Sequence, residues 1–430
     1  MEKHKVDIIY IGGLFALRNL QIHSNGGEDM YFGKSIDQVT FEDIQNLVDT
    51  GVMENRILDY KRELPQNIRG DGKKEFCKDV AAFANSEGGT LIYGMNETEG
   101  GQPEIVGIEI ENVDTLTQQL NQIIRANIEP ILYDFALRVI PINGDNSYLL
   151  LVDIAKSWSG PHAVKVNQFT YRFFTRVNTD NVGLDIQNIR NSFLANEELT
   201  NKIRVFHKER NLQILARENT LPVDGPFLSL HLIPRQAFTS QTRLDLQLVE
   251  RAGLLLSPIF TNGYDYRYNL DGYMYYAGPQ DQETNRTYNQ IFRNGIMEIV
   301  TNRNISMNYN NTKYIPGDAI IQEITSALPK YVQFYKNIGI NAPIYGFLSF
   351  YNVKSHKIYT ENAGLSPSEI THHYINLPEF IIAAENMENL QSHLKDILQL
   401  PLDVLWNAGG IQRCSQLETI LQQGQNTTNY

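Results

Sequence analysis

Residues 54–97 decide the fold of the first half of the chain, and they read ENRILDYKRELPQNIRGDGKKEFCKDVAAFANSEGGTLIYGMNE. Residues 57–64, ILDYKREL, are predicted to form a β-strand, in which successive side chains point to opposite faces. In a strand, Asp59 and Lys61 point to the same face. A carboxylate and an ammonium group are therefore expected side by side.

The next part of this stretch predicts a helix followed by a second strand. Apolar side chains recur at helical spacing over residues 71–87, and Gly88 and Gly89 end the helix because glycine takes positive φ angles at no steric cost. Residues 90–93 read as a short buried strand that leads into a loop containing Glu97. The predicted order is strand, helix, strand and acidic loop.

This stretch resembles the Schlafen AlbA-like domain, and the resemblance extends over roughly residues 33–196. The family pattern is a Glu, an acidic residue five positions later, an aromatic residue and Lys, then AFAN, a GG pair, a hydrophobic strand, Gly and a last acidic residue. The matching positions are Glu54, Asp59, Tyr60, Lys61, residues 82–85, Gly88, Gly89, Gly94 and Glu97. GPHAV at 160–164 and YRFFTRVNTDN at 171–181 are similar to later strands of the family.

The resemblance implies an α+β fold with a mixed sheet and two possible kinds of activity. In nuclease members of the family, three carboxylates hold a divalent metal and the protein cuts RNA, typically tRNA; other members only bind nucleic acid. Here Asp59 stands where Glu is usual, and Glu97 stands where Asp is usual. The resemblance therefore predicts one of two functions. The first is a metal-dependent endoribonuclease of Schlafen type that acts in phage defence, and the alternative is a non-catalytic transcriptional regulator with a C-terminal sensing domain.

The candidate site follows from the same resemblance. Glu54, Asp59 and Glu97 would bind Mg²⁺ or Mn²⁺, which prefer carboxylate oxygens, and Lys61 would neutralise charge on the phosphate. Spacing alone, without the resemblance, favours solvated loop residues and a surface ion pair between Asp59 and Lys61. The expected nucleic-acid contacts, to RNA or single-stranded DNA, are Lys61, Arg62, Arg69, Lys73 and Lys74.

Composition limits the other possibilities. The net charge of −12 argues against a protein that coats nucleic acid through bulk electrostatics. The two cysteines, Cys77 and Cys414, lie far apart without a Cys/His cluster, which excludes a zinc ribbon and favours a cytoplasmic location. No apolar run is long enough to span a membrane. The GKS at residues 33–35 lacks the glycine spacing of a P-loop, so no ATP is expected.

The rest of the chain divides by pattern into further segments. We expect an N-terminal extension (1–32), the AlbA-like domain (33–196), a connecting helix (197–220), a second α+β domain (221–421) and a disordered tail (422–430). In the second domain, residues 288–300 and 318–338 are expected to be helical, and residues 264–276 are expected to form a hairpin. His231, in an apolar strand, is interpreted as a core imidazole.

We also expect a homodimer or a larger assembly. Characterised Schlafen cores resemble two AlbA-like lobes that enclose a positively lined valley, and this chain has one such lobe. Two-fold symmetry is the simplest way to supply the second lobe.

Overall fold

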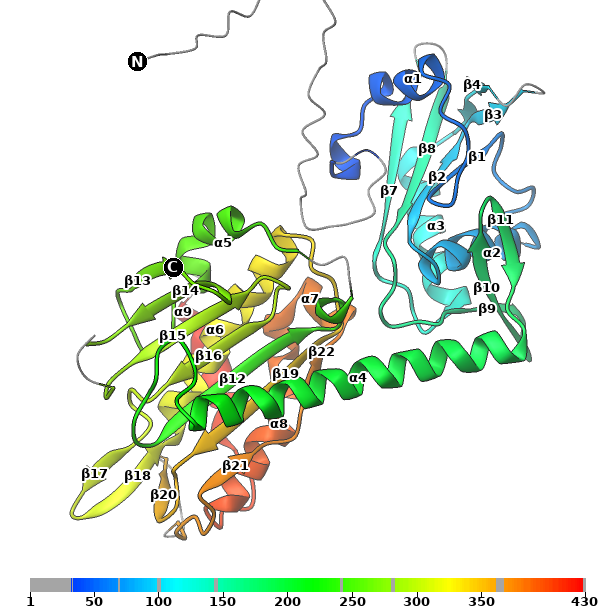
Figure 1. The fold of residues 1–430 in the computed structure, drawn as a ribbon. Coiled ribbons are helices and arrows are strands. Elements are labelled where there is room, and N and C mark those ends of the chain that lie inside the picture. The colour runs from blue at the N-terminus through cyan, green and yellow to red at the C-terminus, as the bar shows by residue number, and fades with distance from the viewer. Residues whose placement is uncertain are drawn as a thin grey trace, which may run out of the picture.

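The computed structural model describes residues 32–427 apart from 33, 69, 99–101, 143–145, 240–242, 280–282 and 361–366. These residues form an N-terminal and a C-terminal lobe, joined by one long helix, α4 (Figure 1). Both lobes mix helices and sheets, so the fold is α+β as predicted. No helix in the described part of the chain has the length and apolar character needed to cross a membrane. Most of the predicted N-terminal extension lies outside the described residues.

The N-terminal lobe is built on a five-stranded sheet in the order β1-β2-β8-β5, with β7 also pairing with β8. Strands β1 and β2 run parallel, with Asp59 opposite Leu91 and Lys61 opposite Tyr93, so the two predicted strands do pair. The other pairings in this sheet are antiparallel. The bounds are β1 Leu58–Lys61, β2 Gly89–Tyr93, β5 Ile108–Glu109, β7 Phe135–Pro141 and β8 Ser147–Ile154.

Helices cover both faces of this sheet because β2, β7 and β8 alternate their side chains between two cores. One core joins α2 and α3 to Leu91, Tyr93 and Val152; the other joins α1 to Leu58 and Ile92. A capping box between Thr40 and Asp43 begins α1. The bounds are η1 Ile36–Gln38, α1 Phe41–Asp49, α2 Gly72–Ala84 and α3 Val113–Asn127.

The glycine pair after α2 is required by close backbone packing. Gly88 and Gly89 have φ angles of 78° and 138°, in the region that favours glycine. A Cβ atom on Gly89 would lie 2.3 Å from the carbonyl oxygen of Ile57, just before β1. The pair therefore lets the chain leave α2 and enter β2 directly beside β1.

Two smaller sheets complete the N-terminal lobe. A four-stranded sheet has the order β11-β10-β9-β6, and β3 pairs with β4 in a short hairpin that carries Glu97. The bounds are β3 Met95–Glu97, β4 Pro103–Ile105, β6 Ile128–Glu129, β9 Ala163–Asn167, β10 Thr170–Val177 and β11 Asp180–Gly183.

The connecting helix is longer than the sequence predicts. α4 runs without a break over Ile186–Leu215, a length of 30 residues, whereas the sequence predicts a connecting helix at 197–220. Asp185 caps its start by accepting a hydrogen bond from the backbone N–H of Asn188. The C-terminal part of α4 packs on the second lobe through Ile203 and Ile214, and this packing stabilises the helix beyond its own propensity.

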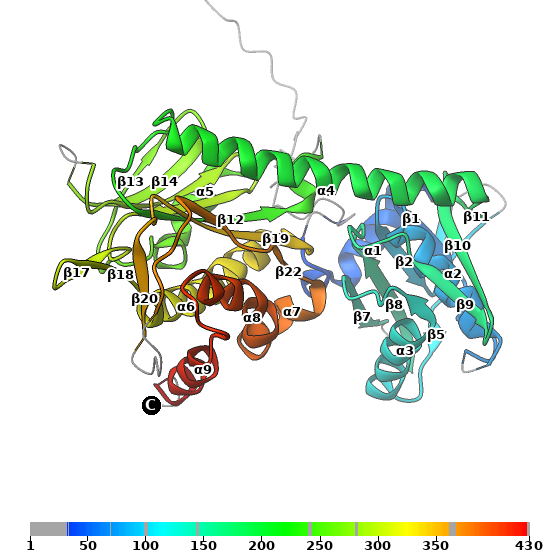
Figure 2. The same cartoon turned by 90° about the horizontal axis from the view of Figure 1, so that it is seen from below.

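The C-terminal lobe is an eight-stranded sheet between α4 on one face and α6, α8 and α9 on the other (Figure 2). Its main path is β13-β14-β15-β16-β12-β19-β21, and β22 also pairs with β19. A three-stranded sheet, β17-β18-β20, adjoins it. The strand bounds are β12 Phe227–Pro234, β13 Asp265–Tyr268, β14 Gly272–Ala277, β15 Thr287–Phe292, β16 Met297–Thr301, β17 Met307–Tyr309, β18 Thr312–Pro316, β19 Ile344–Tyr351, β20 His356–Tyr359, β21 Tyr374–Asn376 and β22 Phe380–Ile382. The helix bounds are η2 Arg235–Phe238, α5 Leu246–Ala252, η3 Gly253–Leu256, α6 Gly317–Asn337, α7 Ala384–Glu388, α8 Leu390–Ala408 and α9 Gln416–Thr427.

Two predictions for this lobe are wrong. Residues 288–300 form β15 and β16 rather than a helix, because Gly295, with a φ angle of 84°, allows a tight turn and both strands are buried on both faces in the middle of the sheet. The predicted disordered tail begins inside α9, which Leu417 and Leu421 anchor to the core; residues 428–430 lie outside the described part.

Other predictions for this lobe are confirmed. Residues 264–276 contain the β13-β14 hairpin, and α6 occupies the second expected helix. His231 is fully buried, with ring nitrogens 3.2 Å from Glu298 Oε2 and 3.2 Å from His207 Nδ1, and is a core imidazole.

Candidate functional site

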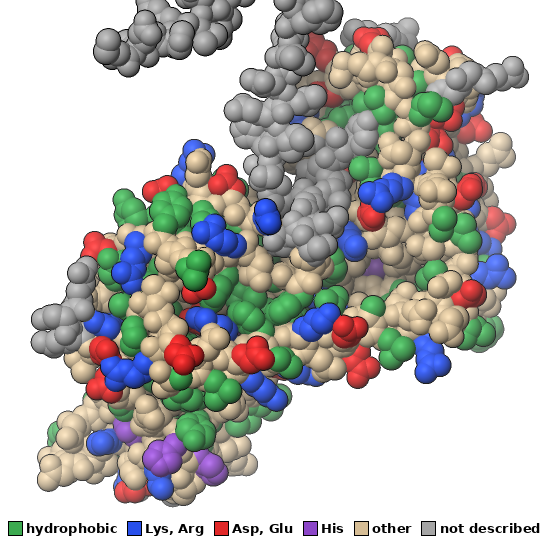
Figure 3. Space-filling model, in the orientation of Figure 1, with side chains coloured by type: hydrophobic (Ala, Val, Ile, Leu, Met, Phe, Trp, Pro, Cys, Tyr) green, Lys and Arg blue, Asp and Glu red, His purple; other side chains and the backbone are tan. Residues whose placement is uncertain are grey.

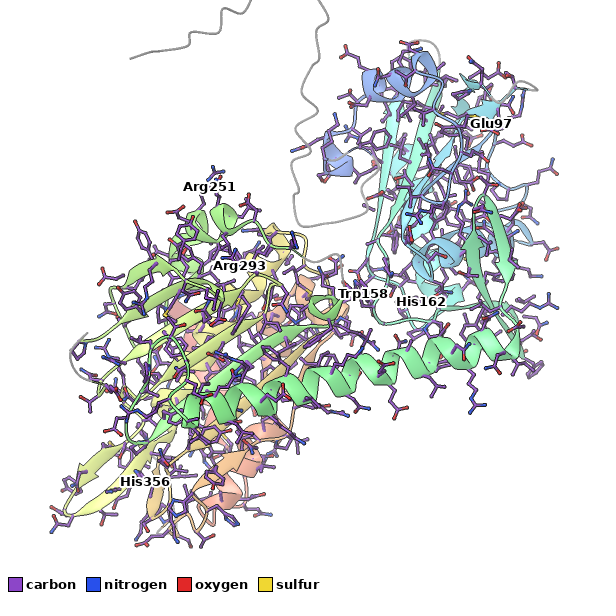
Figure 4. All side chains as sticks on the ribbon, viewed as in Figure 1. Glu97, Trp158, His162, Arg251, Arg293 and His356 are labelled. Atoms are coloured by element: carbon purple, nitrogen blue, oxygen red, sulfur yellow. The ribbon has the colours of Figure 1, made fainter. Side chains whose placement is uncertain are left out.

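The parallel pairing of β1 and β2 brings the predicted carboxylates to one region of the N-terminal lobe. The backbone N–H of Glu54 donates to Glu97 Oε1 at 3.1 Å, and the backbone N–H of Tyr60 donates to Glu54 Oε1 at 2.9 Å. Glu54 is therefore held between the β3 hairpin and β1. Figure 4 shows Glu97 at the end of the lobe far from α4, whereas Trp158 and His162 lie close to α4.

Asp59 lies deeper, on β1, and two cations neutralise it. Its side chain is 1% exposed; Oδ2 lies 2.9 Å from Lys61 Nζ, and Oδ1 lies 3.5 Å from Arg176 Nη2. The sequence placed Asp59 and Lys61 correctly on one face. Their contact is a partly buried ion pair rather than the surface pair that spacing alone favours.

Arg176, on β10, is a residue of the site that the sequence did not single out. Its side chain is buried, donates to the carbonyl oxygens of Asn55 and Leu58, and stacks 4.5 Å from the centre of the Phe83 ring. It therefore links the second sheet to the start of β1. The only signal in the sequence was its place inside the motif at 171–181, because nothing local indicates that this arginine points inward.

The charges in this region shift the pKa values of the flanking groups. Burial, together with the charges of Asp59 and Glu97, raises the pKa of Glu54 to about 7, against the opposing hydrogen bond from Tyr60. Burial alone would lower the pKa of Lys61, but Asp59, Asp79 and Glu54 raise it. Lys61 therefore stays charged, and Glu54 is half protonated near neutral pH.

A cavity of about 490 Å³ opens beside Lys61, between β1 and α2. Charged and polar side chains dominate its lining: Lys61, Glu63, Asp71, Glu75, Asp79 and Tyr93. Asp79 is 4% exposed and accepts a hydrogen bond from Asn181 Nδ2 at 2.6 Å. Asp79 was not predicted as a site residue, because its environment depends on residues far along the chain such as Asn181.

The carboxylates as arranged do not fit a metal ion. Across the described residues, no group of three or more His, Cys, Asp and Glu side chains is spaced to hold one. Asp59 faces two cations, while Glu54 and Glu97 each accept a backbone N–H in place of a metal. We therefore derive no catalytic step through a metal.

Of the predicted nucleic-acid contacts that the structure describes, Lys61 lines the cavity itself. Arg62 is exposed, and Lys73 and Lys74 are partly exposed in the first turn of α2. Lys74 Nζ lies 3.0 Å from Asp71 Oδ1 in an exposed pair that a phosphate can replace at little cost. Arg69 lies outside the described residues. Basic and acidic side chains are interspersed over the face of the molecule seen in Figure 3, which shows no continuous basic surface on that side.

Replacing Arg176 with Met is expected to destabilise the N-terminal lobe. The change leaves Asp59 buried with half of its compensating charge and frees two backbone carbonyls, which costs about 3–5 kcal/mol in free energy of unfolding. Urea denaturation followed by tryptophan fluorescence and circular dichroism measures it. The control is Arg172→Met on the same strand, where the side chain is exposed; equal stability of the two variants would contradict the assigned role of Arg176.

Replacing Glu54 with Gln is expected to stabilise the protein at alkaline pH. The pKa of Glu54 is raised from its ordinary value of 4.5 to about 7, so the folded state binds the proton more tightly and loses stability as pH rises through this window. Because Glu54 is only half-buried, we expect a gain of about 1 kcal/mol at pH 8 and little at pH 4. Thermal unfolding across this pH range, with exposed Glu109→Gln as control, tests it; a loss of stability at pH 8 would show that Lys61 favours the ionised carboxylate.

Comparison with known proteins agrees with the resemblance for the N-terminal lobe. Residues 54–185 match the family model described as Schlafen, AlbA_2. Among solved structures, the N-terminal domain of a RecG-related protein from Nitrosomonas europaea is similar at 19% identity, covering 33% of this chain and 92% of that chain with a TM-score of 0.24. No curated protein matches the chain. The matched residues include Glu54, Asp59, Lys61, Glu97 and Arg176 and the lining of the cavity. The N-terminal lobe therefore contains a Schlafen/AlbA-like domain, which belongs to a family with nucleic-acid-related functions.

Proposed function

We propose that the Schlafen/AlbA-like domain binds RNA at the cavity beside Lys61. The observation that carries the proposal is that Lys61 lines a cavity, and that Lys74 pairs with Asp71 of the same lining, in a domain that matches this family. Lysine and arginine at a rim bind phosphates of a strand, while the interior remains available to other parts of a nucleotide.

The acidic surroundings limit how the RNA is held. The chain carries 49 Asp and Glu against 37 Lys and Arg, so phosphates are repelled over most of its surface. Few phosphate contacts are expected, which gives moderate affinity with a small dependence on salt. Structured RNA such as tRNA, with unpaired loops and ends, is the favoured partner, and single-stranded DNA is the alternative.

Replacing both Lys73 and Lys74 with Ala is expected to weaken binding of tRNA and to reduce its salt dependence. Each phosphate that is neutralised on a single strand contributes about −0.7 to the slope of log K against log salt, so the slope should fall in magnitude by about 1.4. Fluorescence anisotropy with labelled tRNA at several salt concentrations measures it. Lys330→Ala with Lys336→Ala, two exposed lysines of α6, is the matched control; the same slope in both double variants would exclude this contact surface.

A second candidate function is metal-dependent cleavage of the same RNA, as a phage-defence endoribonuclease. It is favoured by the electrostatic coupling of Glu54 to Asp59 and Glu97, since such carboxylates repel one another unless a proton or a cation intervenes. Taking up Mg²⁺ or Mn²⁺ would require these side chains to give up their present partners. Purely non-catalytic binding requires no such change.

Incubating the full chain with tRNA and Mn²⁺, with an EDTA arm, separates the two candidates. If the site is catalytic, Glu54→Gln, Asp59→Asn and Glu97→Gln should each lower the cleavage rate by about 100-fold or more while tRNA binding persists. Glu109→Gln, which is exposed and outside the site, is the control. If the unaltered protein binds tRNA but does not cleave it, the function is that of the non-catalytic nucleic-acid-binding regulator.

We also propose that two copies of the chain associate through their AlbA-like domains, so that two cavities face one RNA. Light scattering at micromolar concentration, with and without tRNA, is expected to give twice the mass of 49.2 kDa. A mass of one chain under both conditions would contradict the association.

A further inference from the structure

One residue that lines the cavity beside Lys61 has a buried hydroxyl group without a hydrogen-bond partner. Tyr93 is 1% exposed, lines the cavity at the end of β2, and its Oη atom makes no hydrogen bond. A buried hydroxyl without a partner costs about 1–3 kcal/mol, so native proteins keep few of them without a reason. We infer that a ligand supplies the missing hydrogen bond to this hydroxyl.

We propose that this cavity receives an unpaired base of the bound RNA and that guanine fits it best. The inference rests on the proposed RNA binding and specifies which part of the RNA enters the cavity. A volume of about 490 Å³ accommodates a base, and sequence-specific RNA recognition uses unstacked bases that are bonded along their Watson–Crick edges.

The charges of the lining select against a phosphate and in favour of N–H donors. Asp79 stands in the wall, while Glu63 and Glu75 are exposed at the rim. Four carboxylates, counting Asp71, share the cavity with one ammonium group, that of Lys61. A phosphate is repelled by this excess of negative charge, whereas the amino group of a base is attracted to it.

Guanine matches this arrangement better than the other bases. Its Watson–Crick edge carries two adjacent N–H donors, N1 and N2, beside the acceptor O6. The donors suit the carboxylate of Asp79, and the acceptor suits the hydroxyl of Tyr93 or the ammonium of Lys61. Adenine and cytosine offer one amino donor, and uracil offers one ring N–H. The flanking phosphates then lie toward Lys73 and Lys74 outside the cavity.

The experiment measures anisotropy of the full chain with short labelled uridine strands that carry one central guanosine, inosine or adenosine, or none. We expect about tenfold tighter binding of the guanosine strand than of the adenosine or all-uridine strand, with inosine, which lacks the N2 amino group, in between. Tyr93→Phe should reduce the preference for guanosine by about fivefold. Asp79→Asn should reduce the preference further.

Stability provides a readout that separates binding from a structural role. Tyr93→Phe removes a hydroxyl that is unpaired in the free protein, so the melting temperature should stay the same or rise. Tyr331→Phe is the matched control, because its equally buried hydroxyl donates to the carbonyl oxygen of Ser257 at 3.0 Å. That variant should melt at a lower temperature and keep the guanosine preference.

The outcomes distinguish failure of the guanine cavity from failure of RNA binding. Binding without any preference among the strands, or a preference that survives in Tyr93→Phe, overturns the guanine cavity and leaves RNA binding intact. Failure to bind every strand and tRNA overturns the proposed function and the cavity together. A melting temperature of Tyr93→Phe that falls as much as that of Tyr331→Phe would show that the hydroxyl serves the fold.

Discussion

The guanidinium of Arg176 is the group on which the arrangement of the N-terminal lobe depends. It lies between Asp59 of β1 and the ring of Phe83 of α2, and it donates to backbone carbonyls at the start of β1. A buried charge needs both a counter-charge and hydrogen bonds. Arg176 obtains both from β1 and the residues just before it, and α2 adds the contact with the Phe83 ring. The second sheet is thereby attached to the segment that carries Glu54 and Asp59.

This attachment also explains why Asp59 can be buried at all. A carboxylate at 1% exposure requires compensation, which Arg176 supplies from one side and Lys61 from the other. The same compensation makes Asp59 a poor free ligand, because its oxygens already face cations. The other carboxylates near Lys61 lie at Glu54 and in the lining of the cavity, where Asp79 accepts a hydrogen bond from Asn181.

The sequence predicted the parts of the site that depend on local rules. The side-chain period of two identified β1, the helical spacing identified α2, and Gly88 and Gly89 marked the return to the sheet. Those elements placed Glu54, Asp59 and Glu97 together once the two strands paired. Arg176, Asp79 and Tyr93 were missed because their roles depend on packing between elements far apart in the chain, where one register step decides whether a side chain is inward or outward. The prediction of a helix at 288–300 was wrong for a related reason. Strands that are buried on both faces lack the alternation of apolar and polar side chains that identifies a strand in the sequence.

The continuity of α4 determines how the two lobes can be separated. The helix spans about 45 Å without a break, and its C-terminal half contributes Ile203, His207 and Ile214 to the second lobe. About one third of the way along α4, Arg235 of the second lobe donates to the carbonyl oxygen of Asn196, and it also donates to that of Trp158 in the first lobe. A protease therefore finds no extended linker to cut between the lobes. Any truncation within α4 exposes apolar side chains to water. The AlbA-like domain is therefore best excised before Ile186, although this removes the contacts that Arg235 makes.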